Sequence, residues 1–97
     1  MDFSWDEHKN VKNFKKHEVW FEEAQSVFDD PFAREIPDND HSTPDEERWL
    51  ILGFSEKPRM LIVCYAELLE NEPIRIISAR KAEPDEEAQY RGFKDER

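Results

Sequence analysis

A nearly continuous run of apolar residues, Met60 to Ala66, limits the folds that this chain can adopt. The run is far too short to span a bilayer, but it suits a central strand that is covered on both faces. A strand over 59–67 needs neighbours to pair with. Residues 48–55 would place Leu50, Leu52 and Phe54 on one face of a strand, and residues 74–79 are rich in isoleucine, so each segment predicts an adjacent strand.

Segments whose apolar residues have helical spacing precede and follow these strands in the sequence. Residues 6–16 predict a first helix with Asp6 as its N-cap, and residues 21–28 predict a second helix with an apolar stripe. Residues 32–36 predict a short edge strand. A third helix begins near Pro84, because proline suits the first helical position. Two helices, a run of antiparallel strands and a last helix give an α+β order.

Length and composition predict one globular domain over residues 1–97, with 92–97 as a frayed tail. The chain is 37% hydrophobic and 39% charged, and its seven Phe, three Trp and two Tyr provide enough bulk for a core. The lone cysteine, Cys64, excludes an internal disulfide, and the polar residues 1–10 do not resemble a signal peptide. We therefore expect a cytoplasmic protein without a membrane partner.

Charge is distributed unevenly along the chain, whose net charge is −10. Residues 29–47 hold eight acidic residues and one arginine, whereas residues 8–17 hold four lysines and no acid. Residues 75–81 hold three basic residues and no acid. The acidic total argues against nucleic acid as an obvious partner, but the two basic segments suit phosphate. The alternative is that the lysines only form a solvated helix face.

Several short motifs occur in an order that resembles one protein family. They lie in residues 3–31, in residues 40–53 and in residues 74–82, which read IRIISARKA. The other residues that carry the resemblance are Phe3, Trp5, Asp6, Lys9, Asn13, Lys16, His17, Phe21, Glu22, Glu23, Ala24, Phe28, Asp29, Asp30, Pro31, Asp40, His41, Ser42, Arg48, Leu52, Gly53, Glu86 and Tyr90. The family is BrnT, the RNase toxin of a bacterial type II toxin–antitoxin pair.

This resemblance implies a RelE-like fold, in which N-terminal helices pack on an antiparallel sheet of three to four strands and a helix ends the chain. It implies a ribonuclease that arrests translation when free. It also implies a neutralising antitoxin, BrnA, a ribbon-helix-helix protein through which the complex would contact DNA. The chain departs from the family in several places. Glu18 replaces a usual glycine, and Trp20 replaces the Ser or Thr that usually precedes the second helix. The connection 67–73 looks longer than usual, and residues 83–87 open the last helix with acids where the family is often basic.

Cleaving RNA without a metal needs a base for the 2′-OH proton, an acid for the leaving 5′ oxygen and cations beside the phosphate. Given the resemblance, the catalytic residues that we expect are His17, Lys16, Arg75 and Arg80. The substrate-binding residues that we expect are Lys9, Lys12, Arg48 and Lys81, with Trp5 and Glu22 in supporting roles. We expect the basic residues Lys9, Lys16, His17, Arg75 and Arg80 to converge on one surface.

Other interpretations of these residues stay open. His17 could simply cap the first helix, and Arg75 could be a solvated strand residue paired with Glu22 or Glu72. The histidines and Cys64 do not form a zinc pattern, and neither a calcium loop nor a glycine-rich phosphate loop is present in the sequence, so we expect no metal and no cofactor. The alternative function is a non-catalytic, toxin-like subunit of an operator-bound complex.

The acidic loop 37–47 and the acidic turn 85–87 have too few evident counterions within the chain. A basic antitoxin surface would supply them, and a bound partner would also stabilise so small a core. The alternative is that the loop is only a solubilising surface.

Overall fold

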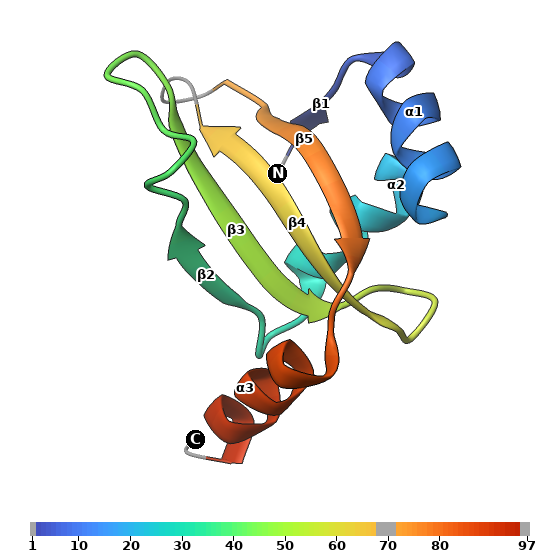
Figure 1. Ribbon diagram of the computed structural model, residues 1–97, viewed down its shortest axis with the longest axis vertical. Coiled ribbons are helices and arrows are strands. Elements are labelled where there is room, and N and C mark those ends of the chain that lie inside the picture. The colour runs from blue at the N-terminus through green and yellow to red at the C-terminus, as the bar shows by residue number, and fades with distance from the viewer. Residues whose placement is uncertain (1, 68–71, 96–97) are drawn as a thin grey trace.

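The computed structural model describes residues 2–67 and 72–95, and Figure 1 shows their arrangement. Five strands form one sheet in the order β1-β5-β4-β3-β2. Their bounds are β1 Phe3–Ser4, β2 Arg34–Pro37, β3 Glu47–Phe54, β4 Met60–Glu67 and β5 Ile74–Lys81. The expected antiparallel sheet of three to four strands is therefore wrong in two respects. The very short β1 adds a strand, and it pairs parallel to β5, so the sheet is mixed.

The helices confirm the expected order, with one change. Their bounds are α1 Glu7–His17, α2 Phe21–Ala24, the 3₁₀ helix η1 Gln25–Asp29 and α3 Pro84–Asp95. Asp6 caps α1 as expected, since its side chain accepts from the N–H groups of His8 and Lys9. The expected second helix divides into α2 and η1. The last helix continues into the segment 92–97 where we expected fraying, and residues 96–97 lie outside the described part.

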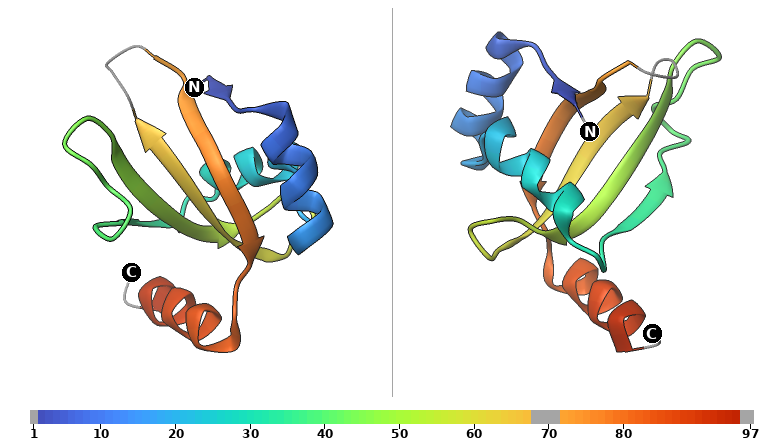
Figure 2. Two further views of the ribbon diagram at one scale, coloured as in Figure 1. Left: turned by 45° about the horizontal axis from the view of Figure 1, so that its top comes forward. Right: turned by 180° about the vertical axis from the view of Figure 1, so that it is seen from behind.

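The main core lies between the sheet and the pair α2–η1, which crosses the sheet in the rear view of Figure 2. Phe21 and Tyr65 are its largest buried side chains. Trp5 packs edge-on against Phe21, with ring centroids 6.0 Å apart, and so contributes to the core. The remaining buried members of this cluster are Val19, Ala24, Val27, Ile51, Leu61, Val63, Ile76 and Ala79. We call this side of the sheet the closed face.

Two buried asparagines fasten α1 beside β5. The Asn13 side chain donates to the carbonyl of Ala79 at 2.9 Å and accepts from its N–H at 3.1 Å, as a neighbouring strand would. Asn10 accepts from the N–H of Phe21 at 2.8 Å. This bond satisfies a donor at the start of α2, where Trp20 provides no side-chain cap. The missing cap that the sequence indicated is thus replaced from another helix.

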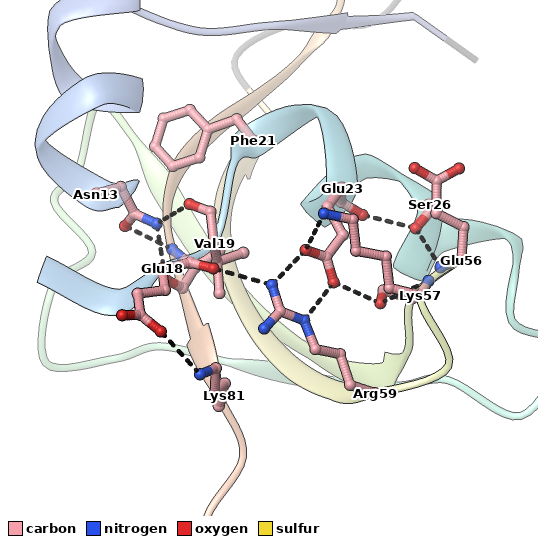
Figure 3. Close-up of polar contacts among 12 residues, drawn as sticks. Asn13, Glu18, Val19, Phe21, Glu23, Ser26, Glu56, Lys57, Arg59 and Lys81 are labelled. Carbon is pink, nitrogen blue, oxygen red and sulfur yellow. Dashed lines mark hydrogen bonds and ion pairs between the residues drawn. The ribbon is translucent and has the colours of Figure 1, made fainter. Parts of the chain in front are cut away.

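A buried carboxylate joins α2 to the β3–β4 hairpin (Figure 3). Glu23 is only 2% exposed and accepts from Arg59 Nε and Ser55 Oγ, each at 2.7 Å. Burial opposes the ionisation of Glu23, but the bonds from Arg59 and Ser55 prevail and hold its pKa below the ordinary 4.5. Arg59 also donates to the carbonyl of Glu18 at 2.9 Å. Glu18 has a φ of 60°, the left-handed conformation that favours glycine.

We call the other side of the sheet the open face, because α3 covers only one end of it. Tyr90 of α3 is 2% exposed and packs with Leu52, Met60 and Ile62. Its hydroxyl donates to Asp30 Oδ2 at 2.7 Å, which fixes the helix to the turn before β2. In Figure 1, α3 lies at the lower end of the sheet, so the upper part of the open face is left without a helix.

Candidate active site

Alternation along the strands decides which side chains reach the open face. Val63, Tyr65 and Ile76 belong to the closed-face core, so the intervening positions of β4 point the other way. Cross-strand partners share a face. Three rows therefore cross the open face from β3 through β4 to β5: Arg48, Ala66 and Arg75; Leu50, Cys64 and Ser78; Leu52, Ile62 and Arg80. Each row spans two strand spacings, about 10 Å.

A cleft of about 490 Å³ opens over these rows. The end of α1 borders it beside β5, and the loop after β2 borders it beside β3. Three of the residues expected in the site line it, namely His17, Arg48 and Arg80. The other lining residues are Asp38, Asp40, His41, Leu50, Ile62, Cys64, Ile77, Ser78 and Ala79. The cleft therefore joins residues from both basic segments of the sequence, which lie far apart along the chain.

His17 is the last residue of α1 and lies four residues after Asn13, on the helix face that meets β5. Burial, and then the positive charges of Lys16 and Arg80, lower the pKa of His17 below the ordinary 6.5. At neutral pH the ring is therefore uncharged and can accept a proton. The backbone N–H of Glu18 closes the last turn of α1, and among the described residues the His17 side chain makes no hydrogen bond, so capping does not employ it.

Arg80 is held by an acid of α3. Its two terminal nitrogens donate to the two carboxylate oxygens of Glu86, each at 2.8 Å. This paired bonding raises the pKa of Arg80 and lowers that of Glu86. The two terminal nitrogens of Arg80, which could bind two oxygens of a phosphate, instead bind the two oxygens of the Glu86 carboxylate. A phosphate that binds here competes with Glu86.

Arg75 lies in the same row as Arg48, two strands away. Among residues 2–67 and 72–95 it makes no ion pair, so neither Glu22 nor Glu72 neutralises it there. Arg48 donates from Nε to Glu46 at 2.8 Å. Both arginines face the open side of the sheet, but only Arg48 lines the cleft.

The lysines of the expected site lie around the cleft and do not line it. Lys16 is close enough to act on the pKa of His17, although its side chain is exposed. Lys81 lies 3.5 Å from the carboxylate of Glu18, and both side chains are exposed. The other two, Lys9 and Lys12, are exposed on α1. The expected convergence is therefore close for His17, Lys16 and Arg80 and looser for the rest.

The two expected supporting residues have structural contacts. Trp5 donates from Nε1 to Glu7 at 3.1 Å, in addition to its contact with the core. Glu22 accepts from Asn10 Nδ2 at 2.8 Å and, among the described residues, pairs with no base. Both residues thus help to position α1, which carries His17.

The acidic loop 37–47 supplies one wall of the cleft. Asp38 has a side chain that is only 12% exposed, and its Oδ2 lies 2.9 Å from His41 Nδ1. Cys64 Sγ approaches the same oxygen at 4.0 Å. Burial raises the pKa of Cys64, which favours the thiol over the thiolate. Sequence reasoning missed this wall because an acidic segment predicts solvent exposure; the three-residue spacing of Asp38 and His41 was the available signal.

Neither a metal cluster nor a membrane-crossing helix is found among the described residues. No group of three or more His, Cys, Asp or Glu side chains is arranged to hold a metal ion in that part of the chain. None of its helices is both long and apolar enough to cross a membrane.

Comparisons with known proteins identify the family of this chain. A family model described as the ribonuclease toxin BrnT of the type II toxin–antitoxin system matches residues 5–86. The chain belongs to the BrnT family. Its fold is similar to the crystal structure of the Brucella abortus ribonuclease toxin BrnT, with a TM-score of 0.65 and 24% identity over 86% of this chain and 97% of that chain. A search of curated proteins found no match.

Membership of the BrnT family confirms the resemblance seen in the sequence. The family is named for ribonuclease toxins of type II systems, so an antitoxin partner is implied at the level of the family. The matched segment, residues 5–86, contains every residue that lines the cleft, and it ends at Glu86, the acid that holds Arg80.

Proposed function

We propose that this chain is an endoribonuclease that cleaves RNA in the open-face cleft by acid–base chemistry, without a metal, and thereby arrests translation. The observation that carries this proposal is the meeting of an uncharged histidine, His17, with two arginines, Arg48 and Arg80, in one cleft. These residues come from α1, β3 and β5, so the fold and not the local sequence assembles them.

The chemistry begins with His17, which takes the proton of a ribose 2′-OH. The 2′ oxygen attacks the adjacent phosphorus, and the bond to the 5′ oxygen breaks as a general acid gives that oxygen a proton. The products carry a 2′,3′-cyclic phosphate and a 5′-OH. Negative charge builds on the phosphate oxygens as this happens. Arg48 and Arg80 stabilise that charge, and Arg80 does so by exchanging Glu86 for phosphate.

The residues outside the cleft lead the RNA strand toward it. Arg75 lies on β5 in the same open-face row as Arg48, outside the cleft lining. The exposed lysines Lys9, Lys12, Lys16 and Lys81 provide positive charge along the border formed by α1 and β5. The affinity for an RNA strand bound through these charges would fall steeply with salt. A plot of log affinity against log salt concentration would have a slope of about −0.7 for each phosphate neutralised.

A ribbon-helix-helix antitoxin similar to BrnA is the partner that we propose, acting in the cytoplasm and contacting DNA on behalf of the complex. Its basic surface would face acids that the toxin leaves exposed. Asp38, Glu46 and Glu86 do have internal partners, which corrects the expectation that these segments lack counterions. Asp45 and Asp85 are exposed and have no ion pair among the described residues. Helices packed on a central sheet also support the RelE-like assignment.

One observation favours a second function, that of a non-catalytic subunit bound to an antitoxin. Glu86 accepts from both terminal nitrogens of Arg80, an edge of the guanidinium that a phosphate would use. If this ion pair never opens, the cleft holds RNA weakly and the chain acts only by binding its partner.

The test uses the purified full-length chain and a labelled RNA of mixed sequence, with a chelator present. The proposed function predicts fragments that end in a 2′,3′-cyclic phosphate, and their formation stops when the antitoxin encoded beside this chain is added. Antitoxin binding with no fragments at any chain concentration would support the non-catalytic function instead.

A further inference from the structure

The cleft holds a second histidine on the side opposite His17. His41 lies in the loop after β2, whereas His17 ends α1 beside β5. The strands β3, β4 and β5 lie between them, so the floor that separates the two rings is about two strand spacings wide. A phosphodiester lying on that floor would present one side to each ring.

The ring of His41 is oriented by a carboxylate. Nδ1 lies 2.9 Å from Asp38 Oδ2 and 3.1 Å from Oδ1, which places a proton on Nδ1. Among the described residues, Nε2 has no hydrogen-bond partner, and the side chain is 67% exposed at the cleft. The carboxylate on Nδ1 orients the ring, and Nε2, which carries a proton in the positively charged ring, is left free to face a leaving oxygen.

The loop that carries this pair is fastened to β3. The N–H of Asp38 donates to the carbonyl of Arg48 at 2.9 Å. Ser42 Oγ accepts from the N–H of Arg48 at 2.9 Å and donates to the carbonyl of Asp38 at 2.8 Å. The position of His41 relative to the cleft floor is therefore set by hydrogen bonds to the backbone of Arg48, the strand residue that lines the site.

We propose that His41, oriented by Asp38, is the general acid that protonates the leaving 5′ oxygen when RNA is cleaved in this cleft. The inference rests on the proposed ribonuclease function. His17 takes the 2′-OH proton and the 2′ oxygen forms its bond to phosphorus. The bond from phosphorus to the 5′ oxygen breaks, and that oxygen receives the proton of His41 Nε2. Water later restores both rings by exchanging protons. Asp38 is a positioning residue, since it acts through His41.

The experiment compares two RNA substrates of one sequence. In the first the leaving atom is the natural 5′ oxygen; in the second it is a bridging 5′ sulfur, which leaves as a thiolate and needs no proton. We expect His41→Ala to slow cleavage of the first substrate about 100-fold or more, within the range usual for a lost general acid. Cleavage of the sulfur substrate should change little. Asp38→Asn should show the same selective loss at smaller size.

His17→Ala serves as the contrasting variant, because loss of the base should slow both substrates. His8→Ala serves as the matched control, because His8 is an exposed histidine of α1 that does not line the cleft. The melting temperature of each variant shows whether it folds.

Each outcome decides one claim. If the unsubstituted chain cleaves neither substrate, the ribonuclease function fails and this inference fails with it. If that chain cleaves both and folded His41→Ala matches it, the function stands and the acid role is overturned. Equal slowing of both substrates by His41→Ala also overturns the acid role, since a contact that only shapes the loop or binds RNA does not distinguish leaving atoms.

Discussion

The two faces of the sheet differ in how they treat charge. On the closed face the buried polar groups of Glu23, Asn10 and Asn13 all have partners, and they hold helices in place. On the open face the charged side chains border a cleft that α3 leaves uncovered. The closed face therefore provides stability, whereas the open face is available to bind and react with a substrate. Substitutions on the two faces should therefore affect different measurements.

The largest expected effect is on the open face. His17→Ala should lower the rate of RNA cleavage by about 100-fold or more, because it removes the proton acceptor. The pKa of His17 is lowered, so the rate for the unsubstituted chain should fall on acidification only below about pH 6.5. Single-turnover assays across pH would check both points. An equal loss for His8→Ala would mean that the cleft is not responsible.

Substitutions on the closed face should change the stability of the protein. Glu23→Gln should lower the free energy of unfolding by about 3 kcal/mol, because Arg59 is left without its carboxylate partner. The pKa of Glu23 is lowered in the folded state, so its contribution is present above the ordinary 4.5 and is lost as pH falls through the lower folded value. Urea unfolding between pH 7 and pH 3 measures this. A loss of RNA cleavage by fully folded Glu23→Gln would contradict the division between faces.

A smaller effect concerns the contact that connects α3 to the cleft. Glu86→Gln should free Arg80 and tighten RNA binding about fivefold, which corresponds to about 1 kcal/mol. The salt dependence should steepen, because one more cation becomes available to phosphate. Asp85→Asn is the matched control: it changes net charge equally in the same helical turn. If both variants bind RNA alike, net charge and not release of Arg80 explains the gain.

The smallest expected effect lies at the junction between α1 and α2. Glu18→Gly should raise the free energy of unfolding by about 0.5 kcal/mol, because glycine removes the strain of φ 60° while adding freedom to the unfolded chain. The exposed contact of Glu18 with Lys81 contributes little. Thermal unfolding would check this, and a clear fall in stability would show that the Glu18 side chain matters more than its backbone.

Sequence patterns predicted what depends on local spacing. Alternation and apolar runs located β3, β4 and β5, and the Asp6 cap located the start of α1. They could not locate β1, because two residues have no periodicity and their partner strand begins about seventy residues later in the sequence. A parallel strand at the sheet edge exists only through that distant pairing.

The site was predictable in part for the same reason. His17 and Arg80 stand out by residue type within basic segments, and the fold does bring them to one cleft. The roles of Asp38 and Glu86 did not stand out, because an acid among acids predicts solvent and only the folded chain shows which ones meet a partner. The sequence therefore does not reveal which acidic and basic side chains from different elements pair in the site.

The most direct test of the account is to locate bound RNA on the sheet. An RNA with 2′-O-methyl groups lacks the nucleophile, so it binds without being cleaved, and NMR spectra of the isotope-labelled chain can follow its titration. We expect shifts in the ring signals of His17 and His41 and in the side-chain signals of Arg48 and Arg80, with the Arg59 signal unmoved. Shifts confined to the surroundings of Arg59, or no shifts at low salt, would contradict the assignment of the open face as the active site.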